Sequence, residues 1–157
     1  MKYIEQLFDI KDKVFVLTGG GGVLAGTISE GLAKAEAKVV LLDIRKENAE
    51  ARANKIVSEG GIAKAFETNV LDVDILEQTK KKIIEEFGQV DVLVNLAGGN
   101  MAGATIAPDK NIFDLNIGDF DKVLALNLNG TVYPSMIFGK HMAERKKGII
   151  INISSMA

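Results

Sequence analysis

The sequence predicts an α/β fold in which helices cover both faces of a parallel sheet, and three observations carry this prediction. Short β-branched apolar runs alternate with longer amphipathic runs along the chain. Most of the short runs are continuously apolar, which is typical of parallel strands buried on both sides. The connections between the runs are short, so the alternation indicates a doubly wound sheet.

Composition limits what this chain can be. Its 157 residues are enough for a single domain with a real core, and 19 basic against 21 acidic residues give a net charge of −2, unlike a nucleic-acid binder. Cysteine is absent, which excludes disulfides, thiolate metal sites and cysteine nucleophiles. The one histidine, His141, is interpreted as structural, and no metal site is expected. The N-terminus lacks a secretory pattern and no apolar run approaches a membrane span, so the sequence predicts a soluble cytoplasmic protein.

Strands and helices follow one another in a regular order. Helical spacing puts Leu24, Ile28 and Leu32 on one face of the first helix. The second helix, Lys46–Ser58, ends at the stop signal Gly60-Gly61. The period of the third helix is set by Ile75, Thr79, Lys82 and Ile83. The predicted strands are Val14–Thr18, Lys38–Asp43, Ala63–Glu67, Val90–Asn95 and Gly148–Ile153.

Four consecutive glycines, residues 19–22, separate the first strand from the first helix. The N–H groups at a helix N-terminus point outward and the helix dipole favours an anion there. Without Cβ atoms, a pyrophosphate could approach this turn closely. The alternative is a turn whose glycines serve only close packing of the strand against the helix.

Asp43 ends the second strand and supports the interpretation of the glycine turn as a phosphate-binding turn. A carboxylate about 20 residues after such a turn lies where a ribose diol would bind, and it would repel a 2′-phosphate. The sequence therefore favours NAD over NADP, although Arg45, two residues later, could accommodate a 2′-phosphate. Without the glycine turn, Asp43 would be interpreted as an acid at a strand end or a helix cap. A P-loop is excluded because no lysine precedes Thr27, whereas an S-adenosylmethionine-dependent methyltransferase stays open.

With these features in place, nearly the whole chain resembles the short-chain dehydrogenase/reductase family. The family turn reads T-G-x-x-x-G-x-G; Thr18 and Gly19 match it, while Val23 and Ala25 occupy its second and third glycine positions. The resemblance implies a Rossmann-like sheet of three layers with the strand order 3-2-1-4-5, lacking the later strands and helices of the family. It also implies that the cofactor contacts Thr18, Gly19, Gly21, Gly22, Val23 and Leu24.

Two further segments match the family. The run "DVLVNLAGG" is similar to the family's N-N-A-G motif, with a leucine in place of one asparagine. The resemblance places its residues Asn95, Ala97 and Gly98 under the ribose and nicotinamide. The run "TNV" is similar to the segment that borders the adenine, where Asn69 replaces an aspartate and Val70 follows.

The resemblance also implies two catalytic residues. Asn127 matches the family's helix asparagine, which interrupts helix hydrogen bonding and holds a proton-relay water; Asn129 and a local cap are the alternatives. Asn129-Gly130 and Pro134 would locally split this region into two helices, but the resemblance favours one helix, distorted at Asn127 and bent near Pro134. In "IIINISSMA", Ser155 matches the serine that hydrogen-bonds the substrate carbonyl; a turn or a helix cap is the alternative.

Within the family, residues 98–120 form an unusually long connection. Together with "NGTVYPSMIFGKHM" this segment looks most like the branch of D-mannonate oxidoreductases of the fructuronate-reductase type. The resemblance implies hydride transfer between NAD and a carbonyl/alcohol pair of a sugar acid, carried out by a homo-oligomer, a dimer or a tetramer.

The family's Tyr-x-x-x-Lys pair does not occur in the sequence. Tyr3 and Tyr133 are followed four positions later by Leu7 and Ile137. The chain is interpreted as an N-terminal fragment of an active reductase, a single dinucleotide-binding domain over 1–157 that is incomplete at its C-terminus, because its last strand would otherwise be an uncovered edge. By itself it is expected to be inactive. A complete, non-catalytic NAD-sensing module is the alternative.

Overall fold

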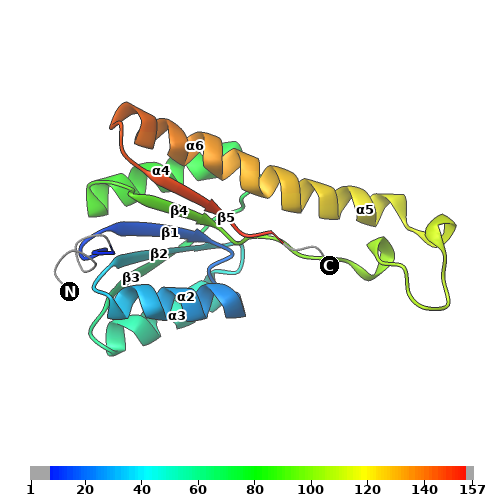
Figure 1. The fold of residues 1–157 in the computed structure, drawn as a ribbon, viewed down its shortest axis with the longest axis horizontal. Coiled ribbons are helices and arrows are strands. Elements are labelled where there is room, and N and C mark those ends of the chain that lie inside the picture. The colour runs from blue at the N-terminus through cyan, green and yellow to red at the C-terminus, as the bar shows by residue number, and fades with distance from the viewer. Residues whose placement is uncertain (1–7, 155–157) are drawn as a thin grey trace.

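The computed structural model describes residues 8–154. Five parallel strands form one sheet in the order β3-β2-β1-β4-β5, as the sequence predicts (Figure 1). The strands are β1 (Val14–Thr18), β2 (Lys38–Asp43), β3 (Ile62–Glu67), β4 (Val92–Asn95) and β5 (Ile149–Asn152). The α-helices are α2 (Val23–Lys34), α3 (Lys46–Ser58), α4 (Val73–Phe87), α5 (Ile117–Leu124) and α6 (Gly130–Glu144).

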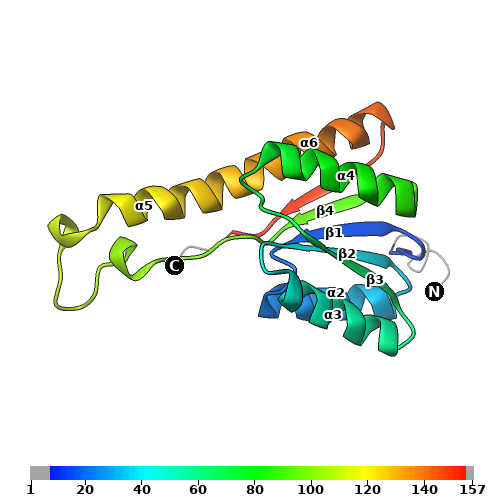
Figure 2. The same ribbon diagram turned by 180° about the vertical axis from the view of Figure 1, so that it is seen from behind.

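Helices cover the two faces of the sheet in pairs. α2 and α3 lie on one face, and α4 and α6 lie on the other, as the two opposite views show (Figures 1 and 2). Strand β1 is buried along its whole length, and its residues alternate between two apolar clusters. Val14 and Val16 belong to the cluster with α4 and α6, whereas Phe15 and Leu17 belong to the cluster with α2 and α3. Burial on both faces explains why the strands read as continuous apolar runs.

The predicted strand boundaries are close to the observed ones. β1, β2 and the helix α3 have the predicted bounds, and β3 begins one residue earlier. β4 begins at Val92, two residues later than predicted, and the carbonyl of Val90 accepts a hydrogen bond from Arg145 Nη1 at 2.7 Å. β5 is one residue shorter at each end than predicted.

The predicted helix faces are confirmed in part. In α2, Ile28 and Leu32 pack against the apolar cluster as predicted, whereas Leu24 is 54% exposed. The fully buried residues of α2 are Ala25, Gly26 and Ser29. Small residues here let α2 lie close to the sheet and to α3. In α4, Thr79 and Ile83 are buried as predicted together with Leu76, whereas Ile75 and Lys82 are exposed. The helix α4 begins at a side-chain cap by Asp72 and ends at Gly88, whose φ of 81° is left-handed.

The region around Asn127 forms one helix with a local distortion, as predicted. A π-helical segment, η3 (Ala125–Asn129), joins α5 directly to α6. Pro134 lies inside α6, and the bend expected there stays a prediction. Before α5, residues 98–116 form an extended connection with two short 3-10 turns, Ala102–Ala104 and Ile112–Asp114. This connection and α5 extend away from the sheet (Figure 1).

Over residues 8–154, no helix combines the length and the apolar character needed to cross a membrane. Within the same range, histidine, aspartate and glutamate side chains do not gather into groups of three or more that could hold a metal ion.

Candidate functional site

The topology brings most of the predicted site residues to one edge of the sheet. From β1 the chain crosses to β2 on one side and later to β4 on the other, so the strand order reverses between β1 and β4. In open α/β sheets such a switch point, at the carboxyl ends of the strands, is where ligands bind. The glycine turn follows β1 and residues 95–98 follow β4, so both lie at this point.

The glycine turn is packed tightly against its own protein. A Cβ atom on Gly20 would lie 2.6 Å from Leu41 Cβ, and one on Gly21 would lie 2.5 Å from Asn48 Cβ. Gly19 has a left-handed φ of 65°, and a Cβ there would meet Ala97 Cα at 3.0 Å. Close packing, which was the alternative explanation for the glycines, therefore accounts for three of the four.

The fourth glycine begins the helix. Gly22 is the N-cap of α2 and offers no side-chain cap, and the N–H of Gly26 bonds to the Gly22 carbonyl at 3.0 Å. The N–H groups of the first helical turn thus have no acceptor within the helix. Val23 and Leu24 of this turn are 80% and 54% exposed. The end of α2 is accordingly open to an anion from solvent.

Asp43 lies beside this turn with its carboxylate fixed on both sides. Its Oδ2 accepts from the Gly21 N–H at 2.9 Å, and its Oδ1 accepts from the Arg45 N–H at 2.9 Å. Only 8% of the residue is exposed. Each carboxylate oxygen keeps a further lone pair for a ligand hydroxyl. The carboxylate therefore sets the shape of the turn as well as its charge.

Thr18 joins the two halves of the switch point. It is fully buried at the end of β1, and its Oγ1 accepts from the N–H groups of Leu96 and Ala97, both at 3.0 Å. These bonds hold the segment after β4 against the glycine turn. The two acceptor lone pairs of the Thr18 hydroxyl are thus used within the protein, a role that its place in the motif did not reveal.

Asn127 clamps the beginning of the long connection. Its Oδ1 accepts from the Gly99 N–H at 2.9 Å, and its Nδ2 donates to the Gly99 carbonyl at 3.0 Å. A Cβ on Gly98 would lie 2.9 Å from Asn127 Oδ1, so the clamp requires a glycine there. The Asn127 carbonyl accepts from Thr131 Oγ1 at 3.0 Å. The predicted catalytic partner, Ser155, lies outside the described residues.

Asn95 is buried at the end of β4, with 2% of its surface exposed. Its Nδ2 donates to Asn152 Oδ1 at 2.8 Å and to Ser135 Oγ at 2.9 Å. Its Oδ1 is buried without a hydrogen-bond partner among residues 8–154. Sequence reasoning missed Ser135 and Asn152, although the strands "VLVN" and "IIIN" end in asparagines that face each other in the sheet. That repeated ending was the available signal.

Asn69 and Val70 lie after β3 as predicted. Asn69 Oδ1 accepts from the Leu71 N–H at 3.0 Å, which shapes the turn before α4. Val70 is 6% exposed, and a Cβ on Gly130 would lie 3.1 Å from its Cγ2. Val70 therefore supports the junction of η3 and α6.

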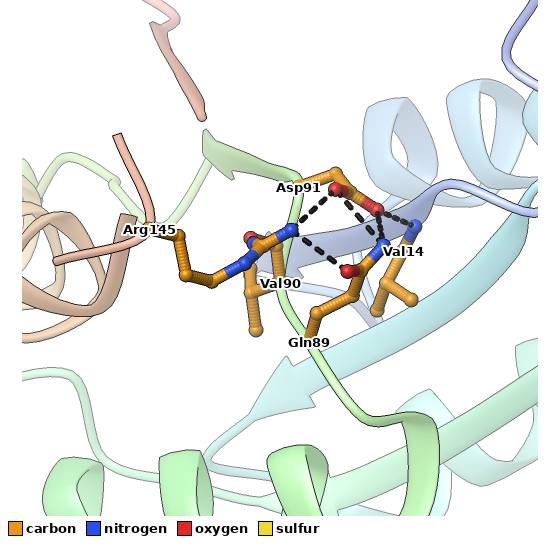
Figure 3. A network of polar contacts seen from close by, with 5 residues as sticks. All are labelled: Val14, Gln89, Val90, Asp91 and Arg145. Atoms are coloured by element: carbon orange, nitrogen blue, oxygen red, sulfur yellow. Dashed lines mark hydrogen bonds and ion pairs between the residues drawn. The ribbon is translucent and has the colours of Figure 1, made fainter. Parts of the chain in front are cut away.

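A second polar cluster lies at the opposite, amino-terminal end of β4 (Figure 3). The buried Asp91 accepts from the Val14 N–H at 3.0 Å, from Arg145 Nη2 at 3.2 Å and from Gln89 Nε2. Burial alone raises the pKa of Asp91, but these bonds outweigh it and hold the pKa below its ordinary value. Burial, together with the nearby charges of Arg145 and Lys80, lowers the pKa of His141. Through the bonds of Arg145 to Asp91 and to the Val90 carbonyl, this polar cluster holds the end of α6 on the sheet.

Comparisons with known proteins agree with this geometry. The family model described as short chain dehydrogenase matches residues 13–157. The chain is 38% identical, over 94% of its length, to an "Uncharacterized oxidoreductase" of Haemophilus influenzae, and 32% identical, over 96%, to the D-threitol dehydrogenase of Mycolicibacterium smegmatis. It spans about half of those relatives, 55% of each.

Among solved structures, a candidate D-mannonate oxidoreductase from Haemophilus influenza with bound NAD is similar to this chain. The TM-score is 0.87 and the sequence identity 36%, over 98% of this chain and 58% of that one. The matched fold, the switch point and the family model all lead to the same assignment. The chain belongs to the short-chain dehydrogenase family.

Proposed function

We propose that this chain is the cofactor-binding part of an NAD-dependent oxidoreductase. The observation that carries the proposal is the Asp43 carboxylate, held by the N–H groups of Gly21 and Arg45 beside the open N-terminus of α2. A fixed negative charge at this place suits the two hydroxyls of a ribose and repels a 2′-phosphate. The methyltransferase alternative gains no support from the family match.

The residues present fit NAD. The free N–H groups of the first turn of α2 would bind the pyrophosphate, Asp43 would bind the adenosine ribose, and the segment 95–98 would lie under the nicotinamide ribose. NAD, when bound, accepts or supplies the hydride. The solved structure with 36% identity was determined with NAD bound, which supports this choice of cofactor.

For the substrate, we propose a sugar acid of the mannonate and fructuronate type. Oxidation of the alcohol by NAD⁺ would give the ketone, NADH and a proton. The description of the similar NAD-bound structure and the name of the D-threitol dehydrogenase both point to polyhydroxylated substrates. Ser155 would hold the carbonyl oxygen, and Asn127 would serve the proton relay. The whole protein would act as a homo-oligomer in the cytoplasm.

The proton step needs residues that the 157-residue sequence does not contain. In this proposal, the Tyr-x-x-x-Lys pair is supplied by the whole protein, so the chain alone would bind NAD without turnover. A whole protein without that pair would instead favour the NAD-sensing function.

Calorimetric titration of the chain with NAD and NADP tests the cofactor proposal. We expect NAD to bind at least about tenfold more tightly, since one charge repulsion of about 1.4 kcal/mol corresponds to that factor. Asp43→Asn should weaken NAD binding and narrow the preference, whereas the exposed Glu47→Gln on α3 should change neither. Tighter binding of NADP, or no binding of either, would contradict the proposal.

A further inference from the structure

His141 lies in the last turn of α6 and is the single histidine of the sequence. Its Nε2 atom is buried and has no hydrogen-bond partner among residues 8–154. A neutral imidazole keeps one ring nitrogen without a proton, so Nε2 can remain an acceptor, whereas a protonated ring carries an N–H on both nitrogens. Protonation of His141 would therefore bury a charged donor that has no acceptor in this part of the chain.

A lysine from the neighbouring helix α4 lies close to this imidazole. The side chain of Lys80 is only 13% exposed, and its Nζ lies 3.5 Å from the carbonyl oxygen of Ile137, one turn before His141. The same Nζ pairs with Glu77 Oε2 at 2.7 Å, within α4. Lys80 is thus fixed at the contact between α4 and α6 by a partner from each helix.

A second cation, Arg145, follows one turn after His141 at the end of α6. Its guanidinium donates to the Val90 carbonyl at 2.7 Å, to Gln89 Oε1 at 2.7 Å and to Asp91 Oδ1 at 3.2 Å (Figure 3). These three acceptors belong to the segment before β4, so the guanidinium cannot turn away without losing its bonds to the sheet.

Two acids also act on His141, but they do not offset these effects. Glu144 is exposed on α6, and the oxygens of Asp91 already accept from Val14, Gln89 and Arg145. Burial, followed by the charges of Arg145 and Lys80, outweighs both acids and holds the pKa of His141 below its ordinary value of 6.5. The cations outweigh the acids although a helix C-terminus by itself favours positive charge.

We propose that His141 makes the packing of α6 against α4 sensitive to acid. The neutral imidazole is accommodated beside Lys80 and Arg145, whereas protonation adds a third positive charge to two cations that are already fixed. The end of α6 can then hydrate the new charge only by moving away from α4. The inference does not depend on the proposed cofactor or substrate.

The direction of the pH dependence follows from the lowered pKa. When the end of α6 is separated from α4, His141 takes up a proton near pH 6.5, whereas the packed state takes it up only at lower pH. The packing is therefore strongest above pH 6.5 and weakens as the pH falls below it. Asp91 titrates below its own ordinary value of 3.8, so its contribution belongs to a more acidic range.

NMR titration of the 157-residue chain, labelled with ¹³C in histidine, observes this imidazole alone. We expect a titration midpoint below pH 6.5 in the wild type. Lys80→Met removes one cation and keeps an apolar stem, so the midpoint should rise toward 6.5. Lys81→Met, at an exposed position on α4, changes the net charge equally and should leave the midpoint unchanged. A wild-type midpoint at or above 6.5, or equal shifts in the two lysine variants, would overturn the proposal.

Hydrogen exchange of residues 137–144 measures the packing of the helix end directly. After correction for the intrinsic exchange rate, protection should fall at least about threefold between about pH 7.5 and about pH 5. His141→Gln stays neutral and should show no such fall. Unchanged protection in the wild type, or an equal fall in His141→Gln, would contradict the proposal, and the NMR titration decides it without that variant. Neither measurement uses NAD or a substrate, so failure of the proposed function would leave both readouts intact.

Discussion

Gly20 and Gly31 show that two glycines of one chain can have opposite effects on stability. A Cβ on Gly20 would lie 2.6 Å from Leu41 Cβ and 2.9 Å from Leu41 Cα, in the middle of the sheet. Gly31 lies inside α2, and a Cβ there would have no neighbour within 4 Å. The first glycine is required by packing, whereas the second only weakens the helix.

We therefore expect opposite results from two alanine substitutions. Gly20→Ala should destabilise the fold by about 1–3 kcal/mol through overpacking against β2. Gly31→Ala should stabilise it by about 0.5–1 kcal/mol, because alanine loses less backbone entropy in a helix. Urea unfolding of both variants beside the wild type measures the two changes; a shift of the same sign in both would show that packing does not distinguish these positions.

At the scale of elements, Asp91, which directly precedes β4, connects this strand to β1 and to α6. Its carboxylate bonds to the start of β1 and, through Arg145, to the last turn of α6. Arg145 also donates to the Val90 carbonyl at 2.7 Å and to Gln89 Oε1 at 2.7 Å. The hydrogen bonds that hold the pKa of Asp91 down therefore also hold α6 on the sheet.

Asp91→Asn should destabilise the fold at neutral pH by about 1–3 kcal/mol, the cost of losing hydrogen bonds to a buried charge. Because the folded-state pKa is lowered, this stabilisation is present above the unfolded pKa and is lost as the pH falls through the folded pKa. The difference in the free energy of unfolding between the variant and the wild type should consequently become smaller at acidic pH. Urea unfolding across a pH series checks this, with the exposed Asp121→Asn as control; a difference that does not depend on pH would contradict the assignment.

The η3 segment and the long connection form a second unit at this scale. Asn127→Ala removes both bonds to Gly99 and should release residues 98–116 from the helix. Asn127→Asp keeps the bond from the Gly99 N–H and should have an intermediate effect. Limited proteolysis measures the change as faster cleavage within 98–116, and Asn129→Ala is the matched control. Equal cleavage of Asn127→Ala and wild type would show that the clamp does not order the connection.

At the scale of the whole molecule, periodicity and turn signals predicted the doubly wound fold class, whereas the strand order and the single distorted helix around Asn127 were predicted from the family resemblance. The unbroken apolar runs of β1 and β2 predicted that these strands are buried on both faces, and the glycine turn predicted the first strand-to-helix junction. The site was less predictable because its contacts are non-local. Leu41 and Asn48 explain Gly20 and Gly21, yet no spacing rule pairs them. The bond between Asn95 and Ser135 likewise depends on how α6 lies across β4.

The apolar stripe along the distorted helix concerns the molecule as a whole. Its members recur every four residues and are exposed by 39% to 67%: Phe120, Leu124, Leu128, Val132 and Met136. Exposed apolar side chains gathered along one helix promote association. Light scattering should show concentration-dependent association of the chain, which Leu128→Glu with Met136→Glu should reduce. Val57→Glu, which replaces a residue of similar exposure on α3, should leave association unchanged. An equal reduction by Val57→Glu would show that net charge, and not the apolar helix surface, controls association.

The π-helical segment has a consequence for how this gene tolerates insertions and deletions. A π turn absorbs one residue more than an α turn without changing the relative phase of the helices on its two sides. Deleting a single codon within 125–129 would therefore let the helix close into regular α geometry while α5 and α6 keep their relative phase. A deletion of one residue elsewhere in the helix would instead rotate everything beyond it by about 100°.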